Sequence, residues 1–338
     1  MFTKLIVSGS LATTLIRCGL VILIGIVCST SIQAEFEWAL RDGFPPPGIL
    51  PREEAVELGR ALFFDQRLSK NNNIACATCH RPELAYTDGL VKSSGSDGDR
   101  VSRNSMSLVN VAYNKTFGWA DNTIHDLESQ MHRPMFGNDP VEIGASTATL
   151  DRIIDDDNYR RLFANAFPDQ HNPVNFNNII AVIAAFEVTL ISDSSPFDRW
   201  LLMDESPSTI AARGFHRFVS LGCSKCHAGL QLRIEGYFNT GVQSTDVGLM
   251  KVSGDEQDRG KFKVPSLRNI SVTAPYMHNG ELQTLEEVLD HYANGPNPEL
   301  DLQGFELTRA EREELLAFLR LLTDTRFLEL QQNSNPTN

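Results

Sequence analysis

Two short segments of the chain contain the pattern Cys-x-x-Cys-His, which combines two thiols with an adjacent imidazole. This spacing is typical of covalent attachment of a c-type haem: the thiols form thioethers to the haem vinyl groups, and the histidine takes one axial position on the iron. A zinc knuckle or a redox disulfide uses the same cysteines, but neither explains a histidine directly after each second cysteine. The sequence therefore predicts two covalently bound haem c groups, held by Cys76, Cys79 and His80 and by Cys223, Cys226 and His227.

The first 34 residues have the organisation of a secretory signal. Lys4 and Arg17 are the only charged side chains before Glu35, and an apolar run covers residues 20–28. That run is shorter than the roughly 20 residues that span a bilayer, which argues against an uncleaved anchor. We expect residues 1–34 to be a signal peptide that is removed, leaving a periplasmic protein without a membrane span.

The composition limits the partners of the mature protein. Removal of two basic residues with the signal changes the formal net charge from −13 to −15. Such an acidic surface argues against nucleic acid or anionic lipid and leaves a basic or charge-patterned protein as a possible partner. About 300 mature residues exceed a single core, so two domains are expected.

An internal repeat divides the chain. Residues 107–112 match residues 266–271, pairing Asn110 with Asn269 and, further along, Trp119 with His278. Gly59 and Phe63 before the first haem motif likewise match Gly214 and Phe218 before the second. The chain reads as a tandem duplication of one haem unit.

Continuous strand alternation is nearly absent, so the fold class is mainly α, with two tandem cytochrome c-like haem domains and long loops. Helices are expected at residues 124–131, 177–191, 210–221 and 285–292, in addition to one that begins at Pro51. Residues 236–260 are predicted to form a loop over the second haem. The expected domains are residues 35–200 and 201–330, followed by a flexible tail at 331–338.

The second axial ligand decides what each haem does, because a strong ligand makes an electron carrier and an empty position lets peroxide bind. At the position where one-haem cytochromes carry methionine, the two halves have Glu142 and the pair His291-Tyr292. A carboxylate over an open haem can move a proton between the peroxide oxygens; an exposed loop carboxylate is the alternative. Methionines elsewhere are more often core residues than ligands.

Several further motifs resemble those of the bacterial dihaem cytochrome c peroxidases and MauG-like proteins. The resemblance covers nearly the whole mature chain. It is carried by residues 62–69 (Leu-Phe-Phe-Asp-Gln-Arg-Leu-Ser), 103–105 (Arg-Asn-Ser), 194–199 (Ser-Ser-Pro-Phe-Asp-Arg), 267–269 (Leu-Arg-Asn) and 274–280 (Ala-Pro-Tyr-Met-His-Asn-Gly).

The resemblance implies roles for individual residues. The first haem would be the peroxide-binding centre, with Gln130, Pro134 and Glu142 in its distal pocket. Trp119 would relay electrons between the haems, and a core tryptophan is the plainer alternative. His278, its repeat counterpart, is expected to contact a cofactor. Backbone oxygens would hold an inter-haem calcium ion, a hard cation that prefers oxygen ligands, at Asn104, Thr273 and Pro275.

Two departures indicate the MauG-like branch. Typical peroxidases carry a histidine in the loop before Arg103 that caps the resting first haem, but residues 92–99 contain none. The first haem is therefore expected to be open in every oxidation state. The methionine ligand of the second haem aligns with Tyr292, whose phenolate would stabilise ferric iron. His291 is the rival ligand.

Together these features imply an enzyme that reacts with hydrogen peroxide at the first haem, shares oxidising equivalents with the second, and oxidises a protein partner by long-range electron transfer. The resemblance suggests a tryptophan as the target, in a partner such as a copper-binding protein. A peroxidase that takes electrons from a small cytochrome c or cupredoxin is the main alternative, and a non-enzymatic dihaem electron carrier is the third.

Overall fold

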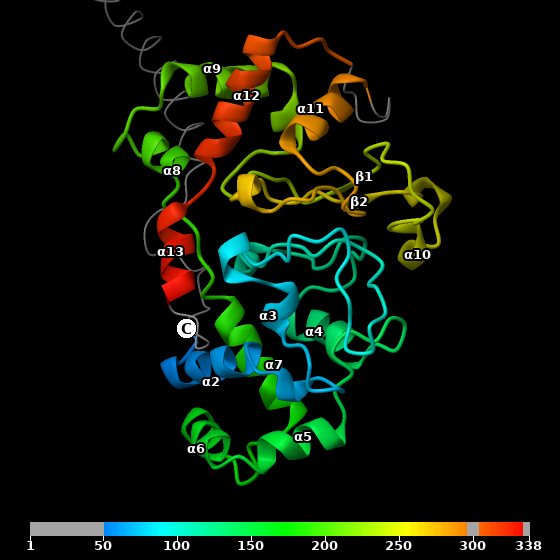
Figure 1. Cartoon of the computed structure of the whole chain (residues 1–338), viewed down its shortest axis with the longest axis vertical. Coiled ribbons are helices and arrows are strands. Elements are labelled where there is room, and N and C mark those ends of the chain that lie inside the picture. The colour runs from blue at the N-terminus through cyan, green and yellow to red at the C-terminus, as the bar shows by residue number, and fades with distance from the viewer. Residues whose placement is uncertain (1–50, 296–303, 334–338) are drawn as a thin grey trace, which may run out of the picture.

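The computed structural model describes residues 51–295 and 304–333, so the predicted signal peptide and the end of the tail lie outside the described residues. The described chain is rich in helix and has little sheet (Figure 1). Strands β1 (Tyr237–Phe238) and β2 (Phe262–Lys263) form one short antiparallel pair. The helices are α2 (Glu53–Phe63), α3 (Cys76–Cys79), α4 (Leu127–Phe136), α5 (Thr147–Ile154), α6 (Asp157–Ala166), α7 (Phe176–Glu187), α8 (Pro196–Leu201), α9 (Thr209–Ser220), α10 (Met250–Ser253), α11 (Leu285–Ala293), α12 (Arg309–Leu321) and α13 (Thr325–Asn333).

Two hydrophobic clusters form the core. The first is built mainly from α2, α4, α6 and α7, and the second from α8, α9, α11 and α12. Figure 1 shows these groups of helices stacked along the long axis of the molecule. Phe197 of α8 belongs to the second cluster, so that cluster begins a few residues before the boundary predicted at residue 200.

The last helix returns to the first cluster. Phe327 and Leu328 of α13 pack there, although they follow the whole second repeat in sequence. Helix α13 also continues to Asn333, so residues 331–333, predicted to be part of a flexible tail, are helical. Within residues 51–295 and 304–333, no helix has the length and apolar character needed to cross a bilayer.

The duplication is visible in matching helix crossings. Gly59 of α2 lies so close to α7 that an added Cβ would come within 1.7 Å of the Val182 carbonyl oxygen. Gly214 of α9 has the same relation to α12: an added Cβ would come within 1.9 Å of the Glu314 carbonyl oxygen. Only glycine allows backbones to approach this closely, which explains why the glycine is repeated in the two halves.

The repeated asparagines confirm the alignment of the halves. Asn110 and Asn269 both adopt the left-handed conformation, with φ of 57° and 59°, and each precedes a short 3₁₀ turn. Their side chains meet at Ser192: Asn110 Nδ2 donates to the Ser192 carbonyl at 2.9 Å, and Asn269 Nδ2 donates to its hydroxyl at 3.0 Å. These buried amides therefore join the two halves.

Some predicted boundaries were wrong, for local reasons. Helix α4 begins at Leu127, because the Asp126 carboxylate accepts a hydrogen bond from the Ser129 amide, and it continues to Phe136. Helix α7 ends at Glu187 instead of residue 191, because the following residues pair with Asn110. The segment 236–260, predicted to be a loop, contains β1 and α10, and α10 lies near the first haem motif.

The α2–α7 crossing gives a stability prediction. Gly59→Ala would force a methyl group into the backbone of α7, so the free energy of unfolding should fall by about 3 kcal/mol. Chemical denaturation measures this change. Glu57→Ala on the exposed side of α2 is the control and should stay within about 0.5 kcal/mol of wild type. Equal values for the two variants would contradict the close packing.

Candidate functional site

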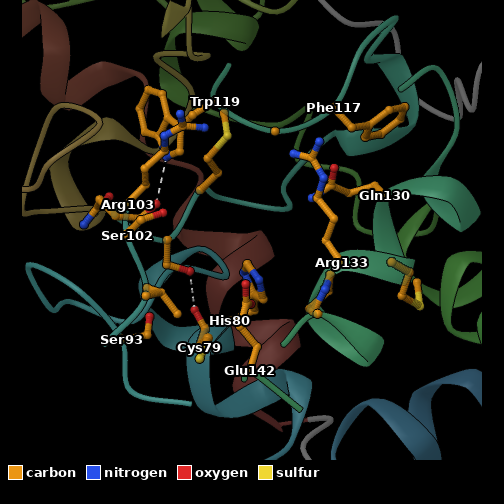
Figure 2. Close-up of a pocket in the computed structure, with 18 of the residues that line it drawn as sticks. Cys79, His80, Ser93, Ser102, Arg103, Phe117, Trp119, Gln130, Arg133 and Glu142 are labelled. Carbon is orange, nitrogen blue, oxygen red and sulfur yellow. Dashed lines mark hydrogen bonds between the residues drawn. The ribbon is translucent and has the colours of Figure 1, made fainter. Parts of the chain in front are cut away.

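A cavity of about 620 Å³ lies against the first haem motif (Figure 2). Helix α4, the loop after it, the segment 101–120 and α10 contribute to its wall. The sequence-predicted residues that line it are Cys79, His80, Asn104, Trp119, Gln130, Pro134 and Glu142. Cys76 lies one turn earlier on α3.

His80 is held for binding through one ring nitrogen. Its Nδ1 donates a hydrogen bond to the Tyr86 carbonyl at 2.9 Å, and the ring also interacts with the Met106 backbone. Burial lowers the pKa of His80, so the ring is neutral at neutral pH. A neutral imidazole fixed at Nδ1 is the usual form of a metal-binding histidine. The imidazole, the adjacent cysteines and the cavity together fit a covalently attached haem.

Glu142 enters the cavity from a loop that is fixed at both sides. The Ile143 amide donates to the Pro134 carbonyl at 2.8 Å, and the Ser96 amide donates to the Glu142 carbonyl at 2.7 Å. Burial raises the pKa of Glu142, and the Arg133 guanidinium acts in the opposite direction. The carboxyl group therefore exchanges a proton closer to neutral pH than an exposed glutamate does.

Helix α4 supplies the neighbouring polar wall. Gln130 Oε1 is buried and has no hydrogen-bond partner among the described residues. Arg133 lies one turn further on and pairs with the buried Asp121 carboxylate. In Figure 2 the Gln130 and Arg133 side chains lie together across the cavity from Trp119. This wall can bind a small polar molecule beside Glu142.

The loop at residues 92–99, which lacks a histidine, is firmly held. An added Cβ on Gly95 would come within 1.9 Å of the Val141 carbonyl oxygen, so the loop lies directly on the backbone next to Glu142. Ser96 Oγ donates to Asn73 Oδ1 at 2.8 Å and accepts from the Asn71 amide at 3.0 Å. The loop therefore fixes the segment that carries Glu142.

Trp119 lies between two cavities. It lines the first cavity and a second one of about 90 Å³, whose wall also contains Asn104, Thr273 and Pro275. Its Nε1 donates to the Asn104 carbonyl at 2.8 Å, and its own carbonyl accepts from the Lys263 amide at 2.7 Å. The structure thus brings the three predicted calcium residues together beside Trp119.

The second haem motif has a similar histidine geometry. His227 Nδ1 donates to the Leu232 carbonyl at 3.2 Å, and burial lowers the pKa of His227 to about 4. Helix α11 presents Tyr292 to the buried side, where burial and the nearby Cys226 and Cys223 raise the pKa of the phenol. This histidine, the cysteine pair and the half-buried phenol fit a second haem.

His291 has a different environment from Tyr292. Its Nε2 donates to the Thr240 carbonyl at 2.8 Å, in the loop at residues 236–260. The two rings are roughly perpendicular, with 76° between their planes. His291 is therefore already engaged through one ring nitrogen by the protein backbone.

His278 differs from its repeat counterpart. It lines neither of the two cavities, is 4% exposed, and stacks on Phe262 with 3.5 Å between ring centroids. Its Nε2 has no hydrogen-bond partner among the described residues. Burial lowers the pKa of His278 to about 4, so the ring is neutral.

Sequence reasoning missed several charged residues of the first cavity, among them Arg133, Glu187 and Lys263. Arg133 could have been found from its position between Gln130 and Pro134 on one helix. Glu187 is a single carboxyl at the end of an apolar helix, and burial raises its pKa to about 8. Lys263 has no sequence signal; burial lowers its pKa to about 8, and it lines both cavities.

A shared zinc site is not formed. Among residues 51–295 and 304–333, no group of three or more His, Cys, Asp or Glu side chains converges as a metal site requires.

Two Cys-x-x-Cys-His segments in a duplicated helical fold fit a dihaem redox protein, and comparisons with known proteins show its family. The model of the family "Di-haem cytochrome c peroxidase" matches residues 53–206. The methylamine utilization protein MauG of Methylorubrum extorquens is 35% identical over 300 residues, which cover 84% of each chain. The cytochrome c551 peroxidase of Pseudomonas aeruginosa is 31% identical over 282 residues, covering 80% of this chain and 79% of that protein.

A solved structure is also similar. The crystal structure of a MauG-like protein associated with microbial copper homeostasis superposes with a TM-score of 0.82 at 35% identity, covering 89% of this chain and 99% of that one. The chain belongs to the di-haem cytochrome c peroxidase and MauG family, as its motifs predicted. It is a peroxide-dependent dihaem oxidoreductase.

Proposed function

We propose that this chain is a MauG-like oxidoreductase that uses hydrogen peroxide to oxidise a protein partner, without needing prior reduction. Peroxide binds in the cavity beside His80, and the partner is oxidised at the surface through long-range electron transfer. When bound, the two haem c groups supply the iron that reacts with peroxide and hold its oxidising equivalents. The site of action is the periplasm.

The fixed loop beside Glu142 carries this proposal. A resting haem that must be uncapped needs a ligand on a mobile loop, but residues 92–99 contain no histidine and are bonded to Asn71, Asn73 and the backbone of Glu142. The pocket beside His80 is therefore permanently accessible to peroxide.

Glu142 performs the acid–base work in that pocket, and Gln130 orients the substrate. The Glu142 carboxylate accepts a proton from the bound peroxide oxygen and returns it to the departing oxygen, which leaves as water. The Gln130 amide orients the peroxide, since its buried oxygen has a free acceptor position. Pro134 fixes the Glu142 loop through the hydrogen bond from the Ile143 amide.

Trp119 and Tyr292 connect this chemistry to the second half of the chain. Trp119 carries electrons between the two haem sites, supported by its position between the two cavities. Tyr292 would hold the second haem together with His227, which is supported by its position near the second cysteine pair and by the engagement of His291 with Thr240. A calcium ion beside Trp119 is held at Asn104, Thr273 and Pro275.

The partner is a protein with an accessible tryptophan, and a copper-binding protein is the first candidate. The similar structure of a MauG-like protein associated with copper homeostasis supports this choice. The similarity to cytochrome c551 peroxidase favours a second candidate function, reduction of peroxide with electrons from a small cytochrome c or cupredoxin.

Peroxide addition to the fully ferric protein separates the two functions. We expect the absorption spectra of both haems to change within one turnover when one equivalent of peroxide is added, with no reductant present. A response that occurs only after reduction of one haem would support the peroxidase instead.

Trp119→Phe tests the proposed relay. The variant loses the indole Nε1 hydrogen bond to Asn104 and the easily oxidised ring. After peroxide addition, the first haem should respond as in wild type, whereas the response of the second should slow at least tenfold. Stopped-flow absorption at wavelengths specific to each haem measures both rates. An unchanged second response would exclude Trp119 as the relay.

A further inference from the structure

The carbonyl that holds His80 lies in a turn that needs external support. Ala85 and Tyr86 both have left-handed backbone conformations, with φ of 49° and 59°. Two backbone bonds close the turn, Tyr86 N–H to the Arg81 carbonyl and Arg81 N–H to the Thr87 carbonyl, each at 2.8 Å. Such conformations are costly for residues other than glycine and persist only where surrounding contacts fix them.

The side chain of Tyr86 receives that support from two helices. Its ring is 1% exposed and lies 5.9 Å from Phe63 of α2 and 6.4 Å from Phe327 of α13, measured between centroids. Its hydroxyl donates to Gln331 Oε1 of α13 at 2.7 Å. Figure 1 shows α13, at the red end of the chain, descending beside the first half of the molecule. The last helix therefore fixes a residue next to the first haem motif.

The second half lacks this arrangement. The carbonyl that accepts from His227 belongs to Leu232, which also has a positive φ, of 49°. Leu232 is fully buried within the second cluster and carries no hydroxyl group. The duplicated turns are equivalent in backbone, and each accepts a hydrogen bond from a repeated serine, Ser107 Oγ to the Ala85 carbonyl and Ser266 Oγ to the Gln231 carbonyl, both at 2.6 Å. Only in the first turn does the residue whose carbonyl accepts from the histidine also bind a distant helix through its own side chain.

We propose that α13 is a positioning element for the first haem, acting through Tyr86 on the imidazole of His80. This inference rests on the proposed binding of the first haem by His80. A hydrogen bond from Nδ1 to a fixed carbonyl orients the ring and increases its basicity toward the metal. Loosening Tyr86 weakens that bond, so the first haem becomes easier to reduce and slower with peroxide, whereas the second haem is unaffected.

Two variants of the holoprotein test the proposal. Tyr86→Phe removes only the hydroxyl group, and Phe327→Leu removes the ring of α13 that contacts Tyr86. Leu330→Ala, on the same helix at a position 54% exposed, is the control. The measurements are the iron–histidine stretching frequency of the ferrous first haem by resonance Raman, the midpoint potential of each haem, and the rate with peroxide.

We expect both test variants to lower the iron–histidine frequency and raise the potential of the first haem alone, with a roughly tenfold slower peroxide reaction in Phe327→Leu. Leu330→Ala should match wild type. An unchanged frequency in Tyr86→Phe, or equal shifts at both haems, would overturn the proposal, and Tyr86→Phe decides alone if Phe327→Leu does not fold. Absence of a histidine-ligated first haem in wild type would instead refute the proposed function.

Discussion

Replacement of Glu142 by glutamine is expected to slow the reaction of the ferric protein with peroxide by roughly 10²–10⁴-fold, the usual contribution of a positioned acid–base group. Glutamine keeps the size and polarity of the side chain but cannot accept the peroxide proton. Stopped-flow absorption of the first haem measures the rate. Glu54→Gln, an exposed carboxylate on α2, is the control and should leave the rate unchanged.

The pH dependence gives the same prediction a second readout. Burial raises the pKa of Glu142, and only the carboxylate form accepts a proton, so the wild-type rate should rise as pH increases through that raised pKa. The rise should be absent in Glu142→Gln. Arg133 lowers the pKa of Glu142, so Arg133→Gln should move the rise to higher pH. A profile shared by wild type and Glu142→Gln would show that another group moves the proton.

Replacement of Tyr292 by methionine should raise the midpoint potential of the second haem by about 0.2–0.4 V, within the range of about 0.8 V that axial ligands set. The phenolate stabilises ferric iron, whereas a thioether favours the ferrous state. Spectroelectrochemical titration, followed at wavelengths specific to each haem, measures the change. The potential of the first haem should remain near its wild-type value.

His291→Ala is the matched variant for the second haem. It removes the hydrogen bond to the Thr240 carbonyl but leaves Tyr292 on the same helix, so the second potential should change little. The opposite result, a large change in His291→Ala and a small one in Tyr292→Met, would assign the ligand to His291.

Local sequence patterns predicted much of the site. The spacing of Cys76, Cys79 and His80 brings two thiols and an imidazole together because all three lie in one turn of chain. The repeat predicted that Gly59 and Gly214 have equivalent roles, and both lie at helix crossings where backbones nearly touch. These features follow from short motifs and their repetition, which can be read directly in the sequence.

Features that depend on distant contacts were not predictable in this way. Lys263 lines the first cavity because β2 is hydrogen-bonded to the backbone of Trp119, which lies far away in the sequence. Helix α13 carries an ordinary amphipathic pattern, and nothing in it indicates that Phe327 packs on the first half. The loop at residues 236–260 was expected over the second haem; Thr240 does contact His291 in the second half, but Lys251 and Val252 of α10 line the first cavity.

The central claim is that the two haem sites are unequal, one open beside Glu142 and one closed by Tyr292. Electron paramagnetic resonance of the fully ferric protein tests this most directly, because it distinguishes five-coordinate from six-coordinate haem iron. The account predicts one high-spin signal from the first haem and one low-spin signal from the second. Two low-spin signals, from two six-coordinate irons, would contradict it.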